Sequence, residues 1–139
     1  MNRAIVIVLI SLLGWNVFPT FADEAAEKAS AAAAPAWLSQ IDAGNYSNSW
    51  RDASAYFKGA VTENGFRDAL ARARKPLGKL LSRKLTKAQS ATSLPGAPDG
   101  NYVVMQFDSS FANKKHAVET VTFMQEKDGK WKAAGYYIK

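Results

Sequence analysis

The chain has 139 residues, of which 47% are hydrophobic and 12% aromatic, which is enough to build one core and argues against disorder. It contains no cysteine, so disulfides, thiolate chemistry and lipid attachment at a cysteine are excluded. The formal net charge of +6 is a modest basic excess, which favours weak attraction to anionic surfaces and carries no information about the fold.

The first 22 residues have the pattern of a secretory signal peptide. Arg3 precedes an apolar run from Ala4 to Phe18, and Thr20-Phe21-Ala22 follows as a small-x-small cleavage site. The apolar run of about 15 residues is shorter than the roughly 20 that span a bilayer as a helix. We therefore predict cleavage after residue 22, which lowers the net charge to +5, and a periplasmic or secreted product that is not an integral membrane protein. The alternative is an uncleaved anchor.

A single domain is predicted at residues 36–139, after an alanine-rich linker at residues 23–35. Residues 23–34 have no apolar side chain larger than alanine, so they can bury little surface and are expected to form a tether or a fraying first helix. Pro35 suits the first turn of a helix, where its missing N–H is no loss, and Gly44 is expected to end that helix.

Two further helices follow from apolar spacing and capping residues. The second carries an aromatic stripe at spacings of three and four, and the third begins after Thr62 as N-cap. The third helix should kink or end between Lys75 and Leu81, because Pro76 removes a backbone donor and Gly78 is a poor helix former.

The second half of the chain predicts four antiparallel strands at about residues 82–94, 101–111, 116–127 and 130–138. The segments between them are rich in turn-forming residues, and Asp128-Gly129 is a strong signal for a short hairpin. Helices followed by a meander indicate an α+β domain, in which three N-terminal helices pack on one face of a curved four-stranded sheet.

The strand register follows from turn length and from the two-residue repeat of side chains. A two-residue turn at Asp128-Gly129 pairs Phe123 with Ala134, Val121 with Tyr136 and Glu119 with Ile138. A three-residue loop at 113–115 pairs Phe107 with Val121, whereas an even-length loop would oppose two acids and flip the apolar faces. The inner face then carries the core, and the outer face is more apolar than a solvated face needs. We predict a homodimer interface there, formed by Tyr102, Val104, Trp131 and Tyr137.

Long segments of the chain resemble the bacterial domain-of-unknown-function 4019 family. The resemblance covers nearly all of residues 36–139 and is clearest in WLSQIDAGNYSNSW, RKPLGKLLSRK, TSLPGAPDGNYVVMQFDSSFANKKHAVETVTF and DGKWKAAGYYIK. It implies a place in the nuclear transport factor 2-like (cystatin-like) superfamily, whose members form a cone from helices and a bent sheet. It implies no catalytic residue, and fold does not settle function in that superfamily.

Common catalytic and cofactor motifs are absent from the sequence. The chain has no phosphate-binding loop, dinucleotide fingerprint, zinc-protease helix or nucleophile elbow, and with one histidine and no cysteine a zinc site would need several convergent carboxylates. We therefore expect no cofactor and no metal. The single histidine, His116, is interpreted as exposed and incidental.

Glu119 is the acid with the strongest claim to a role, because the predicted register places it on the apolar inner face. A carboxylate there is either desolvated and suited to acid-base chemistry, or paired with a cation such as Arg83. If the cone is hollow, Glu119, Phe123 and Tyr136 are the candidate ligand-binding residues of a small acid-base enzyme. If it is filled, the pair is structural.

A basic run, ARARKPLGKLLSRK, occupies residues 71–84. It has no interleaved aromatic residue to stack on bases, so we expect no nucleic acid as a partner. Two interpretations stay open: a solvated helix face, or a site for an anionic lipid or polysaccharide of the cell envelope. The candidate anion-binding residues are Arg72, Lys75, Lys79, Arg83 and Lys84.

The sequence thus favours a non-enzymatic exported module that binds a ligand or partner and dimerises through the outer face of the sheet. The first alternative is the acid-base enzyme with Glu119 in a pocket. The second is anion binding by the basic third helix.

Overall fold

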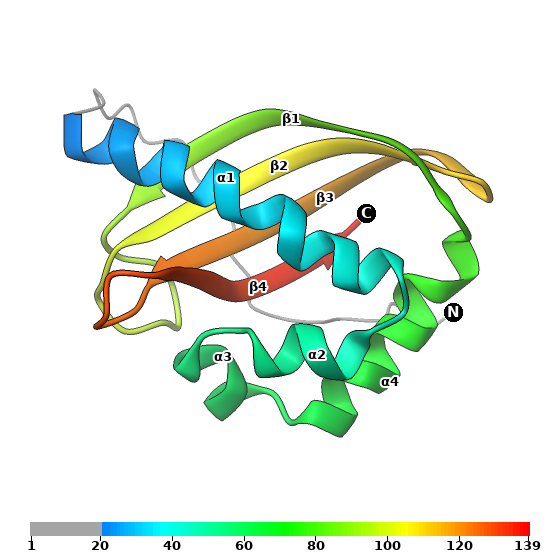
Figure 1. Ribbon diagram of the computed structural model, residues 1–139, viewed down its shortest axis with the longest axis horizontal. Helices are drawn as coiled ribbons and strands as arrows, with labels where there is room; N and C mark the ends of the chain where they lie inside the picture. The colour runs from blue at the N-terminus through cyan, green and yellow to red at the C-terminus, as the bar shows by residue number, and fades with distance from the viewer. Residues whose placement is uncertain (1–20) are drawn as a thin grey trace.

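Helices come first and strands second in the structure, a computed structural model that describes residues 21–139 (Figure 1). The helical half comprises α1 (Phe21–Asp42), α2 (Tyr46–Arg51), α3 (Ala55–Ala60), α4 (Glu63–Ala73) and a 3-10 turn at Lys75–Leu77. The strands are β1 (Leu80–Ala91), β2 (Tyr102–Phe111), β3 (Lys114–Gln125) and β4 (Trp131–Ile138). The predicted α+β class is confirmed.

The four strands form one antiparallel sheet in the order β1-β2-β3-β4, which curls without closing. Helix α1 lies across its inner face, and α2, α3 and α4 gather beyond the β4 edge (Figure 1). Trp37 of α1 is central to the core between these layers, because its ring contacts Phe66, Phe123 and Tyr136 with centroid separations of 6.3, 6.2 and 5.9 Å. Such aromatic contacts add to the stabilisation from apolar burial.

The alanine-rich segment predicted as a linker is part of α1, which is continuous from Phe21 to Asp42 with Pro35 inside it. Ser30 and Ala34 are fully buried, so this part of the helix packs on the sheet. The side chain of Glu27 accepts a hydrogen bond from the Ser90 backbone N–H at 3.1 Å, which ties the helix to the edge strand β1. Of the two expectations, a tether or a first helix, the structure has the helix, because alanine buries little surface but has the highest helix propensity.

The second predicted helix is two short helices, α2 and α3, separated at Ser54. The Ser54 hydroxyl accepts from the Phe57 N–H at 3.1 Å, which starts a new helix, while the Ser54 N–H donates to the Ala133 carbonyl at 2.8 Å. The predicted cap at Thr62 is confirmed, since its hydroxyl accepts from the Gly65 N–H at 3.0 Å. Gly44, with φ of 80°, ends α1 as predicted.

The predicted pairing of β2 with β3 was wrong by two residues, although each side chain lies on the predicted face. The turn has two residues, 112 and 113, and Phe107 opposes Glu119 where Val121 was expected. An irregularity follows at once, in which Lys115 and His116 oppose the single residue Ser110. The bulge adds one residue to an even-length turn, so the alternation of faces is restored.

The β3–β4 hairpin contains a second compensating pair of irregularities. Its loop has three residues, 127–129, closed by a 2.8 Å bond from the Glu126 N–H to the Lys130 carbonyl. Phe123 therefore opposes Ala133, whereas Ala134 was predicted. Ala134 is then an extra residue in β4, after which the predicted pairs of Val121 with Tyr136 and Glu119 with Ile138 are confirmed.

The outer sheet face is partly covered by the chain itself, so the four residues predicted for a dimer interface do not form one exposed patch. Leu94, from the loop that follows β1, buries Tyr102 and Val104 to 1% and 3% exposure. Trp131 lies on the inner side and packs against the main core, because the bulge at Ala134 reverses the face of the first β4 residues. Of the four predicted interface residues, only Tyr137 is exposed, at 44%.

No helix within residues 21–139 combines the length and apolar content needed to cross a membrane. The predicted signal peptide lies almost entirely outside this range.

Candidate functional site

A group of charged and hydroxyl side chains, the polar cluster, lies between the end of α1 and the inner sheet face. Arg83 is at its centre and bonds two carboxylates bidentately. Its Nε and Nη2 atoms donate to Glu119 at 2.7 and 3.1 Å, and its Nη1 and Nη2 atoms donate to Asp42 at 2.7 and 2.9 Å. Bidentate contacts of this kind are the strongest form of arginine-carboxylate pairing. The cluster consists of Asp42, Arg74, Arg83, Ser109, Glu119 and Tyr136.

Glu119 is fully buried, and both of its oxygens have further donors. The Ser109 hydroxyl donates to Oε1 at 2.5 Å, and the Tyr136 hydroxyl donates to Oε2. Burial, followed by the nearby Glu119 charge, raises the pKa of Tyr136 well above its ordinary value, so Tyr136 stays a donor. Burial lowers the pKa of Arg83, but the hydrogen bonds that it donates to Asp42 and Glu119, and the negative charges of those two groups, outweigh burial and raise that pKa overall.

Arg74 extends the polar cluster to the end of α4. Its Nη2 atom lies 3.3 Å from Asp42, its Nη1 atom donates to the Gly78 carbonyl at 2.6 Å, and its guanidinium is stacked 4.3 Å above the Phe111 ring. The cluster therefore joins α1, the residue after α4 and all four strands. Its two arginines balance its two carboxylates, as buried charges require. This geometry agrees with the structural ion-pair interpretation of Glu119, which was one of the two predicted from the sequence.

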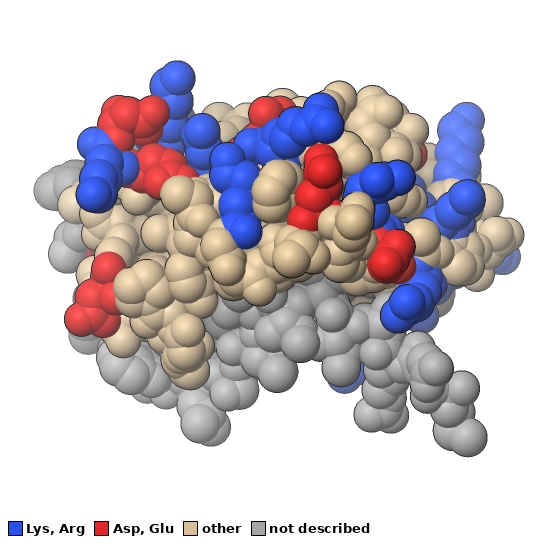
Figure 2. All heavy atoms as spheres, turned by 90° about the horizontal axis from the view of Figure 1, so that it is seen from below, with Lys and Arg blue, Asp and Glu red and all other residues tan. Residues whose placement is uncertain are grey.

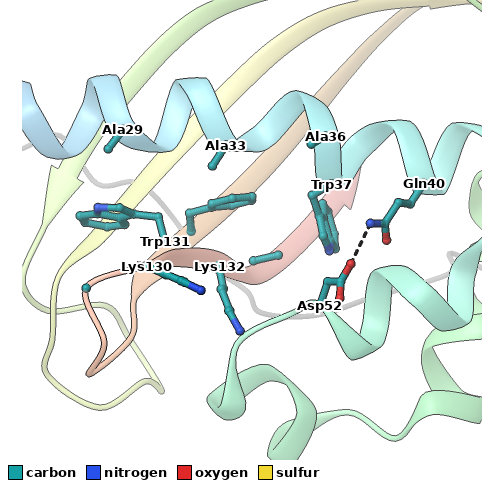
Figure 3. Close-up of a pocket in the computed structure, with 12 residues that line it drawn as sticks. Ala29, Ala33, Ala36, Trp37, Gln40, Asp52, Lys130, Trp131 and Lys132 are labelled. Carbon is teal, nitrogen blue, oxygen red and sulfur yellow. Dashed lines mark hydrogen bonds between the residues drawn. The ribbon is translucent and has the colours of Figure 1, made fainter.

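A separate groove opens between α1 and the first residues of β4 (Figure 3). Its volume is 430 Å³, which lies in the range of small-molecule sites. One wall is made by Ala29, Ala33 and Ala36 of α1, whose small side chains leave room, and the floor is aromatic. The aromatic residues are Trp37, Phe123 and Trp131.

The edge of the groove is polar and carries unused hydrogen-bonding capacity. Gln40 donates from Nε2 to Asp52 Oδ2 at 2.8 Å, while its buried Oε1 atom has no hydrogen-bond partner among residues 21–139. Lys130 and Lys132 also line the groove, and neither forms an ion pair with another described residue. The groove thus combines an apolar floor with two uncommitted positive charges.

The predicted ligand-binding residues are divided between these two places. Phe123 lines the groove, whereas Glu119 and Tyr136 belong to the polar cluster and do not line the groove. Glu119 therefore does not share this groove with Phe123, whereas the acid-base alternative places both residues in one pocket.

The predicted anion-binding residues are also divided. Arg72, Lys75, Lys79 and Lys84 are exposed, but Arg83 is committed to Asp42 and Glu119. Seen from the side of α2, α3 and α4, basic and acidic side chains are interspersed over the described part of the surface (Figure 2). The basic run is thus split between a solvated surface and a buried ion pair.

His116 is exposed, and it lines a 730 Å³ hollow at the far end of the sheet with Lys115, Leu81 and Val118. No hydrogen bond links His116 to a neighbouring side chain in the described part of the chain. Within residues 21–139, no three histidine, aspartate or glutamate side chains converge in a way that could hold a metal ion.

Sequence patterns did not identify several residues of the polar cluster and of the groove. Asp42 follows the last apolar residue of α1 and Arg74 follows the last residue of α4, so apolar spacing indicated neither the partial burial of Asp42 nor the full burial of Arg74. Lys130 and Lys132 lie in the predicted last strand and were not among the candidate residues. The two lysines flank Trp131 in the sequence. Because the predicted register put Trp131 on the outer face, only knowledge of the bulge at Ala134 would have placed the lysines at the groove.

A comparison with known families matches residues 33–136 to the model described as "Protein of unknown function (DUF4019)". No curated protein matches the sequence. The family match covers most of the described residues and includes the polar cluster and nearly all of the groove.

Proposed function

The chain belongs to the DUF4019 family of proteins of unknown function, and we propose that it is an exported, non-enzymatic module that binds a small ligand in the groove between α1 and β4. The single observation that carries this proposal is the open 430 Å³ groove with an aromatic floor. Concave, mostly apolar sites with a few polar groups are typical of ligand binding. The cone-like arrangement of helices on a curled sheet supports our placement of the chain in the nuclear transport factor 2-like superfamily.

The contrast with the polar cluster supports binding over catalysis. A general acid or base must reach the proton that it transfers, but Glu119 is fully buried and its oxygens are held by Arg83, Ser109 and Tyr136. In the groove the one carboxylate, Asp52, is exposed and bonded to Gln40, with no second acid among the lining residues. Neither place offers a matched acid-base pair.

Titration with the neutral fluorescent probe N-phenyl-1-naphthylamine tests the proposed site. We expect saturable binding, with affinity about tenfold weaker in Ala29→Phe, because a phenyl ring at this exposed lining position occupies the space above Trp131 (Figure 3). Ala32→Phe is the matched control, since Ala32 is exposed on the same helix and does not line the groove. Equal affinity in both variants would refute the site.

Export is tested separately by fractionating cells that express the full chain and sequencing the N-terminus of the mature protein. We expect the periplasmic or secreted fraction to contain a product that begins at Asp23. A full-length product retained in the membrane fraction would instead support the uncleaved anchor.

A further inference from the structure

We propose that the groove selects a small amphipathic anion, whose apolar body lies on the aromatic floor and whose charged group is held by Lys130 and Lys132. This inference rests on the proposed function, because it assigns the ligand class of the same groove. It adds the sign of the ligand's charge and the orientation of the ligand in the groove.

The position of the two lysines supports this assignment. Lys130 and Lys132 flank Trp131 in the sequence and lie along the β4 side of the groove, opposite the alanine wall of α1 (Figure 3). An apolar chain that covers the floor and leaves the groove across the β4 side therefore brings its terminus to these ammonium groups. Opposite charge at such a rim adds affinity and specificity to apolar contact.

The charges that line the groove also favour an anion over a cation. Asp52 is the one acidic residue among the lining residues, and its Oδ2 atom already accepts from Gln40. The two lysines have no ion-pair partner in the described part of the chain. A bound anion would supply that partner, whereas a bound cation would face two like charges beside a single carboxylate.

The volume favours a free small molecule as the source of the anion. At 430 Å³ the groove is near the lower end of the range for small-ligand sites. Apart from Gln40, its α1 side is formed by alanine side chains, which offer no hydrogen bonds to a polymer backbone. A single-chain carboxylate fits these features.

The test compares two probes that differ in charge. N-phenyl-1-naphthylamine is neutral, and 8-anilino-1-naphthalenesulfonate carries a sulfonate on the same ring system. We expect replacement of both lysines, Lys130→Gln with Lys132→Gln, to weaken sulfonate binding by about three- to tenfold while binding of the neutral probe changes less than twofold. Lys127→Gln, at an exposed position outside the groove, is the matched control.

A second arm uses aliphatic competitors against the bound neutral probe. We expect decanoate to displace it from the wild-type protein at a lower concentration than decanol, and the advantage to shrink in the double lysine variant and at high salt. Circular dichroism and thermal unfolding of each variant establish that the fold is retained.

The outcomes separate this inference from the proposed function. If the neutral probe binds and Ala29→Phe blocks it, but the lysine replacements affect both probes equally or not at all, the anion assignment is overturned and the groove remains the ligand site. If neither probe binds, or Ala29→Phe has no effect, both proposals fail. Selective loss of sulfonate and decanoate binding in the double lysine variant supports both.

Discussion

The polar cluster and the groove both adjoin Trp37, which lines the groove and contacts the Tyr136 ring, but they use charge in opposite ways. In the cluster Glu119 is fully buried and both of its oxygens are bonded, and Arg83 divides its donors between two carboxylates. In the groove Lys130 and Lys132 have no ion-pair partner among the described residues. A buried charge with all its partners is committed to the fold, whereas an accessible charge without one is available to a ligand.

The largest expected effect is on stability, from Glu119→Gln in the polar cluster. Removing the negative charge leaves Arg83 partly uncompensated beside Ser109 and Tyr136, so the free energy of unfolding should fall by about 3–5 kcal/mol. Urea unfolding measures this loss. Glu24→Gln, at an exposed position on α1, is the control and should change stability by less than about 0.5 kcal/mol.

The contrast between a structural polar cluster and a ligand-binding groove would be wrong if the Glu119→Gln variant remained as stable as the wild type and lost probe binding. That result would mean that the carboxylate acts on the groove and is not a structural group. We expect instead that the folded fraction of this variant binds N-phenyl-1-naphthylamine with wild-type affinity.

A smaller effect is expected from Tyr136→Phe, which removes one hydrogen bond to a charged group and should cost about 1.5–3 kcal/mol at neutral pH. The pKa of Tyr136 is raised by burial and by Glu119, so folding favours the protonated form. The wild-type protein should therefore lose stability as the pH rises above about 10, where only the unfolded tyrosine ionises, by about 1.4 kcal/mol per pH unit.

Thermal unfolding between pH 8 and 11 measures this dependence. Tyr136→Phe should show a shallower decline in Tm at alkaline pH than the wild type. Tyr137→Phe, which removes an exposed hydroxyl on the neighbouring residue, should retain the wild-type slope. Identical slopes in all three proteins would contradict the assigned role of Tyr136.

On the groove side, Trp131→Ala should weaken N-phenyl-1-naphthylamine binding by about tenfold, or about 1.4 kcal/mol, because it removes part of the aromatic floor. Probe fluorescence measures the affinity. Tyr137→Ala removes an aromatic ring outside the groove and should leave the affinity unchanged. Equal losses in both variants would show that the probe binds elsewhere on the sheet.

The smallest effect is expected from the exposed basic residues at the end of α4 and in the segment that joins α4 to β1. Replacing Arg72, Lys75 and Lys79 together with Gln should change the free energy of unfolding by no more than about 0.5 kcal/mol and leave groove binding unchanged. Flotation with anionic vesicles tests the basic-helix alternative. Salt-sensitive binding that weakens in this triple variant and not in Lys127→Gln would establish it.

The sequence predicted those parts of the fold that depend on local pattern. The cap at Thr62 and the end of α1 at Gly44 follow from side-chain and backbone chemistry within one helical turn. The ion pair of Arg83 with Glu119 could be anticipated, because a carboxylate on an apolar face needs a cation.

The remaining features depend on irregularities that leave little local signal. A two-residue turn followed by a bulge at Lys115 and His116 puts the side chains on the same faces as the predicted three-residue loop. The alternation of side chains therefore could not distinguish these two hairpins. The groove was missed because Trp131 was placed on the outer face. The involvement of Asp42 and Arg74 depends on tertiary approach, which periodicity does not report.

The extra residue at Ala134 divides β4 into two segments with different partners. Before it, Trp131, Lys132 and Ala133 belong to the groove; after it, Tyr136 belongs to the polar cluster. Deleting Ala134 would give the strand a single alternation and force one segment to face the wrong side of the sheet. One inserted residue thus lets an eight-residue strand serve both a ligand surface and the ion-pair network that holds the sheet to its helices.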